Sequence, residues 1–138
     1  MSRTLLDSSA ILNLFRVSGK AAMPILAQSS TLSLASYEIG NALRTEAYLR
    51  RTTTPEKAER ALTDIMLLLG LTEIIHPDPT DAAETLRIAG KDSLTYYDAS
   101  YLHAAMKGHS LATEDSRLAE AAKREGIHTL TAFQLSSR

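Results

Sequence analysis

Acidic residues stand at three places where the predicted elements of this chain would bring them together. Asp7 directly follows a short apolar run that predicts a strand, and Asp115 follows another such run by three residues. Glu38 lies early in the helix that is predicted after a further strand. In a parallel sheet covered by helices, the carboxyl ends of the strands gather at one edge, where ligands bind. We therefore expect these three carboxylates to converge from distant parts of the chain.

Asp98 is a fourth acid, placed on a predicted helix rather than at the end of a strand. Its neighbours at helical spacing, Tyr101, Leu102 and Ala105, belong to the stripe that faces the core. An isolated charge on such a stripe is strongly disfavoured, so its carboxylate should bind a cation or accept hydrogen bonds.

A cluster of carboxylates without histidine or cysteine suits hard divalent cations such as Mg²⁺ or Mn²⁺, which prefer oxygen ligands. Two such ions ~4 Å apart can activate a water and stabilise the leaving oxygen at a phosphodiester. The acids thus indicate metal-dependent phosphoryl transfer, with phosphates of the substrate completing the coordination.

Each acid also has a purely structural interpretation. Asp7 could begin a turn, and Asp98 fits the third position of a helix that Thr95 caps. Asp115 could cap the helix that begins at Ser116. Their placement at one predicted edge of the sheet favours the shared site over three separate local roles.

The elements that must position these acids alternate along the chain. Short buried runs predict strands at Thr4–Leu6, Thr31–Ser33, Thr72–Ile75, Ser110–Ala112 and His128–Leu130. Apolar spacing, prolines and glycines predict helices at Ser9–Phe15, Lys20–Ala27, Ala35–Arg50, Thr54–Leu69, from Asp78 to about Gly90, Tyr96–Lys107 and Ser116–Glu125. The helices at 35–50 and 54–69 should form a hairpin. This order predicts an α/β fold with a short, mainly parallel sheet flanked by helices.

Length and composition limit the other possibilities. The 138 residues suit a single domain over 1–138, and 44% hydrophobic with 22% charged residues is typical of a globular protein. Apolar runs such as Ile65–Leu69 are far shorter than the ~20 residues that span a bilayer, so we expect neither a membrane span nor a signal peptide. The absence of cysteine excludes disulfides and fits a cytoplasmic location.

The net charge is −1, which excludes a strongly basic nucleic-acid arm. Without the four acids, 15 basic residues would face 12 acidic ones, so a metal-loaded form need not repel a polyanion. The candidate phosphate contacts are basic residues near the first two acids: Arg16 and Arg44, with Lys20, Arg50 and Arg51 beside them. Each of these residues also fits a solvated basic face.

Four segments together resemble a known family. They are 5-LLDSSAIL-12, 35-ASYE-38, 95-TYYDASYL-102 and 111-LATEDSRL-118. In order and spacing they resemble the PIN-domain ribonucleases, especially the VapC-type toxins of toxin–antitoxin pairs, over essentially the whole chain. The resemblance implies a single PIN-like domain in which Asp7, Glu38, Asp98 and Asp115 bind Mg²⁺ or Mn²⁺ and cleave single-stranded or loop RNA. It also implies that the hydroxyls of Ser9 and Thr113 support the first and last acids.

The same resemblance implies two protein partners. One is a small antitoxin protein that blocks the site, and the other is a second copy of the chain in a homodimer. The helices at 35–50 and 54–69 are where we expect an apolar groove for the antitoxin, because amphipathic helices dock into such surfaces.

The remaining polar and aromatic residues have structural interpretations. The four histidines, His76, His103, His109 and His128, are scattered, and we assign none as a general base or zinc ligand. Tyr37, Tyr96, Tyr97 and Tyr101 crowd two acid motifs, where they could pack in the core or stack on unpaired bases.

Two alternative functions come from the class of binding modules. A receiver-like signalling domain is also α/β and acidic at one edge, but it would need an acidic pair where Ser8 and Ser9 follow Asp7. A PIN fold that only binds RNA or protein would not need all four acids, and all four are present.

Overall fold

A five-stranded parallel sheet forms the centre of the protein. The structure is a computed structural model that describes residues 3–138. The strands are β1 (Thr4–Leu6), β2 (Ser29–Leu32), β3 (Glu73–Ile75), β4 (Ser110–Ala112) and β5 (Thr129–Leu130). They lie in the order β3-β2-β1-β4-β5, and every neighbouring pair is parallel. The prediction of an α/β fold with a mainly parallel sheet is confirmed.

The central strands are short, and both of their faces are covered. Leu5, Leu6 and Leu111 are fully buried, and Leu5 lies opposite Leu111 in the register of β1 with β4. Parallel sheets of this kind are apolar on both faces, since helices pack on each side. The sheet therefore forms the middle layer of three.

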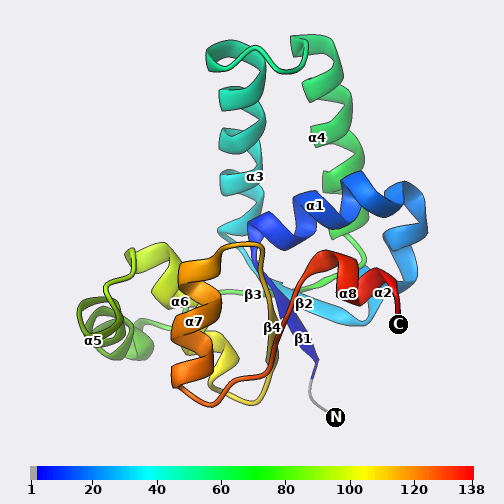
Figure 1. The fold of residues 1–138 in the computed structure, drawn as a ribbon. Helices are drawn as coiled ribbons and strands as arrows, with labels where there is room; N and C mark the ends of the chain where they lie inside the picture. The colour runs from blue at the N-terminus through cyan, green and yellow to red at the C-terminus, as the bar shows by residue number, and fades with distance from the viewer. Residues whose placement is uncertain (1–2) are drawn as a thin grey trace.

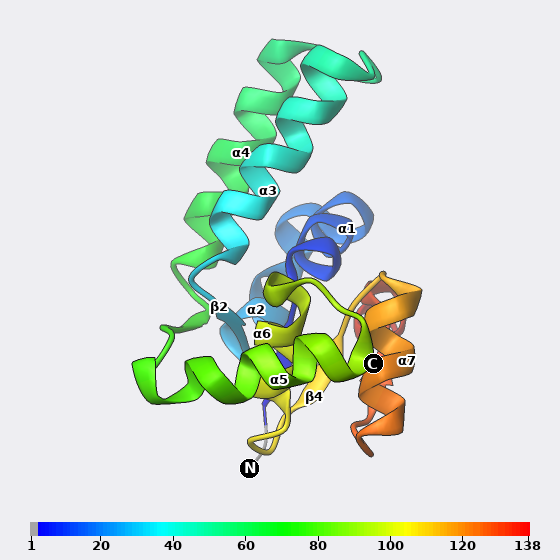
Figure 2. The ribbon, with the colours of Figure 1, turned by 90° about the vertical axis from the view of Figure 1, so that its left-hand side faces the viewer.

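Helices cover both faces of the sheet, as Figures 1 and 2 show. On one face lie α1 (Ser8–Ser18), the 3₁₀ turn η1 (Gly19–Ala22), α2 (Met23–Ala27) and α8 (Ala132–Ser136). On the other lie α5 (Ala82–Asp92), preceded by the 3₁₀ turn η3 (Pro79–Asp81), with α6 (Tyr96–Ala105) and α7 (Ser116–Arg124). The predicted hairpin is formed by α3 (Ala35–Arg44), the π-helical turn η2 (Thr45–Leu49) and α4 (Pro55–Leu69), and it projects away from the sheet.

The structure differs from the predicted elements in several places, and the helix predicted at 35–50 is divided into α3 and the π-helical turn η2. β2 begins at Ser29 rather than Thr31, because the hydroxyls of Ser29 and Ser30 are satisfied inside the sheet layer by the Ile25 carbonyl (2.6 Å) and the Glu73 carboxylate (2.8 Å). Instead of one helix from Lys20, the chain forms η1 and then α2. The short α8, fixed by a capping box in which Thr131 and Gln134 bond to each other's backbone N–H groups, was not predicted.

The strand order excludes one of the alternative functions. Receiver domains belong to the doubly wound folds with strand order 2-1-3-4-5. Here β1 lies between β2 and β4, and β3 lies at the outer edge beyond β2. The receiver-like interpretation is therefore wrong.

One helical stretch, Ser8–Ala27, is long and apolar enough to cross a membrane by length and mean hydropathy (1.2) alone, which the sequence analysis did not anticipate. Gly19, with a φ of 53°, breaks this stretch into α1 and α2. Ala10, Ile11 and Leu14 of α1 are buried in the core. This stretch therefore forms a helical layer of the fold.

The hairpin offers a direct test of the packing, because two adjacent leucines of α4 differ in burial. Leu68 is 8% exposed and Leu67 is 73% exposed. We expect Leu68→Ala to lower the free energy of unfolding by about 2–5 kcal/mol, through lost burial and the cavity that remains. The matched variant Leu67→Ala should change it by less than about 0.5 kcal/mol. Urea unfolding measures both values, and equal effects would contradict this packing of α4.

Candidate active site

At the centre of the sheet, β1 is the strand from which the chain adds strands first on one side and later on the other. From β1 the chain builds β2 and β3 on one side, and it later builds β4 and β5 on the other. In open α/β sheets, ligands bind beyond the carboxyl ends of the strands at such a point. Asp7 follows β1 there and Thr113 follows β4, so the two residues meet although 106 positions separate them.

Asp7 is held by hydrogen bonds to both of its carboxylate oxygens. Its Oδ1 accepts from the Ser9 hydroxyl at 2.7 Å and from the Ala10 backbone N–H at 2.8 Å, and its Oδ2 accepts from the Thr113 hydroxyl. The Ser9 hydroxyl in turn accepts from the backbone N–H of Glu114 (3.0 Å), and the Thr113 hydroxyl accepts from that of Asp115 (3.0 Å). Each hydroxyl thus has one donor and one acceptor partner, which fixes the rotamer of Asp7. Ser9 and Thr113 both contact Asp7.

Ionisation of Asp7 is unfavourable in free energy despite these hydrogen bonds. The side chain is only 4% exposed. Burial raises the pKa of Asp7 from 3.8 to about 6, the hydrogen bonds oppose this rise, and the negative charge of Asp98 adds to it. Asp7 therefore gains from any positive charge brought close to it.

Asp98 interacts electrostatically with other acids. Burial raises the pKa of Glu38 above its ordinary value, with a further contribution from the charge of Asp98. Burial likewise raises the pKa of Asp98, and the charge of Asp115 adds to that rise. The charge of Asp98 thus contributes to the raised pKa values of Asp7 and Glu38, and the charge of Asp115 contributes to that of Asp98.

The structural interpretations of the acids hold at the same time. Asp7 and Asp115 are the N-caps of α1 and α7, and the Asp115 carboxylate accepts from the Arg117 N–H at 2.8 Å. Asp98 is the third residue of α6, whose cap Thr95 accepts from its N–H at 3.1 Å. Capping aims these carboxylates at one edge, because helices on both faces of the sheet begin there.

The donor set fits a magnesium-type cation in kind. All four side chains offer carboxylate oxygen, the ligand that Mg²⁺ and Mn²⁺ prefer. Within residues 3–138, no three Asp, Glu, His or Cys side chains are grouped closely enough to hold one ion directly. Mg²⁺ usually takes one or two carboxylates and retains several waters, so it does not require such a group.

Several polar contacts of the site were not predicted from the sequence. The fully buried Tyr101 donates its hydroxyl to Glu38 Oε1 at 2.9 Å, and the Ser8 side chain opposes the rise in the pKa of that carboxylate. Arg117 lies near enough to Asp98 to lower its pKa. For Tyr101, its position three residues after Asp98 on one helix was the available signal.

Glu114 connects this loop to the end of the chain. Its Oε1 accepts from the backbone N–H of Ala132, the first residue of α8, at 2.7 Å. Its own N–H donates to Ser9, the hydroxyl that supports Asp7. Glu114 therefore fixes both α8 and the loop that carries Thr113 and Asp115.

The basic and aromatic residues that were candidates for RNA contacts differ in exposure and in their partners. Arg16 is exposed and forms an ion pair with Glu46 of η2, with its Nη2 2.6 Å from Oε2. Arg44 is exposed on the last turn of α3. Among the tyrosines, Tyr101 is a core residue, whereas Tyr37, Tyr96 and Tyr97 are exposed.

The fold and the carboxylate edge define an α/β domain of the kind that the sequence resemblance implies. A model of the PIN domain matches residues 4–124. The chain belongs to the PIN domain family.

Individual relatives agree with this assignment. Exonuclease VapC9 of Pyrobaculum aerophilum is 40% identical over 88 residues, which cover 63% of this chain and 62% of that protein, less than two thirds of its length. The crystal structure of PAE2754 from Pyrobaculum aerophilum matches with a TM-score of 0.79 at 28% identity, over 99% of this chain and 98% of that one. The crystal structure of DNA-bound VapBC from Salmonella typhimurium matches in fold with a TM-score of 0.66 at 18% identity, over 96% and 99%. The resemblance to VapC-type PIN domains is confirmed.

The buried charge of Asp7 predicts how stability depends on pH. The folded state holds the Asp7 proton more tightly than the unfolded chain, so its contribution is fully present below pH 3.8 and is lost as the pH rises to about 6. The loss is roughly 3 kcal/mol, at about 1.4 kcal/mol per pKa unit. We expect Asp7→Asn to abolish this decline and to raise the free energy of unfolding at pH 7.

Chemical denaturation at several pH values between 3.5 and 7 measures this effect. The matched control is Asp64→Asn on the exposed surface of α4, which should keep the wild-type pH profile. A wild-type profile in Asp7→Asn would show that the Asp7 carboxylate is not destabilised by its burial.

Proposed function

We propose that this chain is a divalent-metal-dependent endoribonuclease, the toxin of a toxin–antitoxin pair. The observation that supports this most is that Asp7, Glu38 and Asp98 each have a pKa raised by burial and by the charge of another of the four acids. Structural caps alone would not require acids that repel each other. The PIN family membership and the name of the relative VapC9 support a nuclease as well.

In this proposal Asp7, Glu38, Asp98 and Asp115 bind Mg²⁺ or Mn²⁺. When bound, the metal supplies a hydrolytic water of lowered pKa and stabilises negative charge on the phosphate. Ser9 and Thr113 keep Asp7 ionised and in one rotamer, and Tyr101 orients Glu38 in the same way. Arg117, Arg16 and Arg44 are the candidate contacts for phosphates of the RNA strand.

The position of the cut distinguishes two nuclease classes. The relative VapC9 is named an exonuclease, whereas we propose internal cleavage, because a toxin that acts on loops of folded RNA must cut away from the ends. A circular single-stranded RNA has no ends, so only an endonuclease cuts it.

The test is cleavage of that circular RNA and of a linear RNA with exposed loops, with Mg²⁺, Mn²⁺ or EDTA. We expect both substrates to be cut with either metal and neither with EDTA. Asp98→Asn should lower kcat/KM about 100-fold or more, roughly 3 kcal/mol of transition-state stabilisation, because it removes the central charge of the cluster.

Asp64→Asn, a matched change outside the site, should leave the rate unchanged. Cutting of the linear RNA alone would indicate an exonuclease. Equal cutting by Asp98→Asn, with its fold shown by circular dichroism, would refute the role of this acid, and no cutting of either RNA under any condition would favour a PIN fold that only binds.

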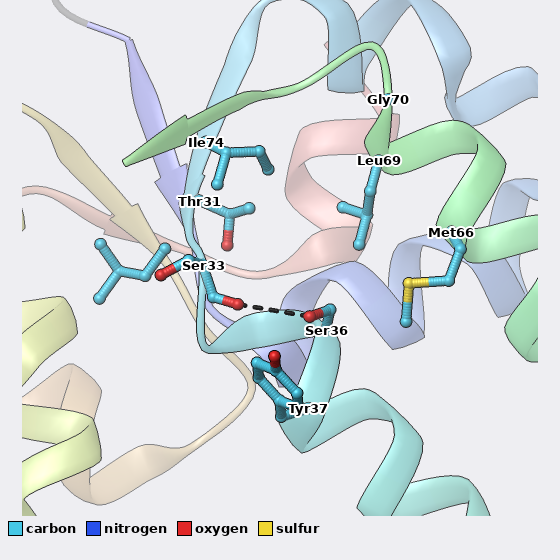
Figure 3. Close-up of a pocket in the computed structure, with 9 residues that line it drawn as sticks. Thr31, Ser33, Ser36, Tyr37, Met66, Leu69, Gly70 and Ile74 are labelled. Carbon is cyan, nitrogen blue, oxygen red and sulfur yellow. Dashed lines mark hydrogen bonds between the residues drawn. The ribbon is translucent and has the colours of Figure 1, made fainter. Parts of the chain in front are cut away.

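For the antitoxin we propose the apolar surface at the base of the hairpin. A pocket of about 360 Å³ opens there between β2, β3, α3 and α4, lined by Tyr37, Met66, Leu69 and Ile74 among others. Figure 3 shows Tyr37 and Met66 at its two sides and the bond from the Ser36 hydroxyl to the Ser33 carbonyl (3.3 Å) at its edge. Exposed apolar side chains beside a groove are typical of sites that bind an amphipathic helix. We also propose that this protein forms a homodimer and is cytoplasmic, as its resemblance to the VapC-type toxins implies.

The charge variant Met66→Glu tests this surface. We expect it to weaken binding of the cognate antitoxin at least tenfold, because a carboxylate would be buried against apolar groups, and to leave RNA cleavage unchanged. Met23→Glu, at another exposed methionine on α2, is the matched control and should bind as the wild type. Titration calorimetry measures both, and wild-type affinity in Met66→Glu would place the antitoxin elsewhere.

A further inference from the structure

A second pocket lies on the opposite side of the β2 end, between α6 and the segment from β3 to α5. Its volume is about 300 Å³, and its walls include Leu34, Ile75, Tyr96, Tyr97 and His103. Its lining from α6 includes Tyr97, Ser100 and Ala104, which lie on one face of that helix. The acid residue Asp98 lies on the neighbouring face.

Two residues that line this pocket are near neighbours of acids along the chain. Tyr97 and Asp98 are adjacent residues of α6, so their Cα atoms are ~3.8 Å apart. On the other side, the carbonyl of Leu34 accepts the backbone N–H of Glu38 at 3.1 Å, so the pocket wall begins one helical turn before that acid. A strand with a phosphate at the acids therefore has its neighbouring base within reach of the pocket.

The lining combines apolar walls with aromatic rings and imidazoles. His76, His103 and His109, three of the four histidines of the chain, line this one pocket although the sequence scatters them. Among the hydrogen bonds of residues 3–138, none involves the imidazole of His76 or His103, so their ring nitrogens are available to a ligand as donor or acceptor. Lys107, which also lines the pocket, forms an ion pair with Asp81.

Such a pocket fits a flat, apolar ring with polar edges. Ligand sites of about this volume are mostly apolar with a few polar groups that fix orientation. Unpaired bases stack on exposed aromatic side chains and bond through their edges, and Tyr97 is 60% exposed at the entrance. An apolar side chain of a protein partner would fill the volume but would leave the imidazoles without a partner.

We propose that this pocket binds one unpaired nucleobase, that of the nucleotide whose phosphate lies at the acid cluster. The inference rests on the proposed nuclease function and adds to it a subsite that recognises the base. Tyr97 provides the stacking surface, and the imidazoles of His76 and His103 contact the edge of the base.

The test is binding of the four ribonucleoside 5′-monophosphates to the full chain, followed by the NMR signals of the His76 and His103 imidazoles. These probes contain no internucleotide bond, so binding is measured whether or not the protein cuts RNA. We expect saturable shifts of both imidazoles with at least one nucleotide. Ribose 5-phosphate, which has the same sugar and phosphate but no base, should leave them in place.

Two pairs of variants locate the binding. Ala82→Phe places a ring in the pocket from the exposed start of α5, and Ala83→Phe, the exposed neighbour that does not line it, is its control. Tyr97→Ala removes the stacking surface, and Tyr48→Ala, 56% exposed on η2, is its control. We expect Ala82→Phe and Tyr97→Ala each to raise Kd about fivefold or more, and the controls to leave it unchanged.

Each outcome separates this inference from the proposed function. The base pocket would be overturned, even if the protein cuts RNA, by either of two results. Ribose 5-phosphate could cause the same imidazole shifts as the nucleotides, or none of the nucleotides could cause any shift. Base-dependent shifts lost in Ala82→Phe would support it, and if the protein then cut no RNA, only the nuclease proposal would fall.

Discussion

The burial of the Asp7 carboxylate is the constraint on which the arrangement of this site depends. A carboxylate that is 4% exposed needs several donors, and it takes them from Ser9, Ala10 and Thr113. The first two are local to α1, but Thr113 directly follows β4. This bond therefore requires the ends of β1 and β4 to lie side by side, as they do in the middle of the sheet.

The four acids show how one side chain can meet a structural and a chemical need together. Asp7 and Asp115 cap helices, and Asp98 follows the capping Thr95. An N-cap carboxylate lies beside the positive end of its helix, which offsets part of the repulsion between the acids. The positive ends of the helices that begin at this edge thus help to stabilise several negative charges close to one another.

Much of this could be predicted from the sequence because the relevant signals are local. The strands carry apolar runs, and Asp7, Glu38 and Asp115 follow three of them within a few residues, so the expectation that these three acids share one edge comes from the parallel sheet alone. The contacts that are not local could not be predicted. Tyr101 is recognisable as a core residue, but its bond to Glu38 depends on how α6 lies against α3, and the bond from Glu114 to Ala132 depends on α8, which carries only a five-residue signal. The gathering of three histidines around one pocket is likewise a property of the packing.

The hydrogen bond between Asp7 and Thr113 also has a consequence for the order in which the residues of the site come together. The two residues are 106 positions apart, so this contact closes one of the longest loops that the fold contains. During synthesis Asp7, Ser9 and Glu38 emerge early, and for most of the elongation of the chain they lack the threonine and the two later acids. Long-range contacts of this kind form late in folding. A chain that stops before β4 lacks the Thr113 hydroxyl that Asp7 accepts from, so the complete set of acids exists only once both halves of the sheet are present.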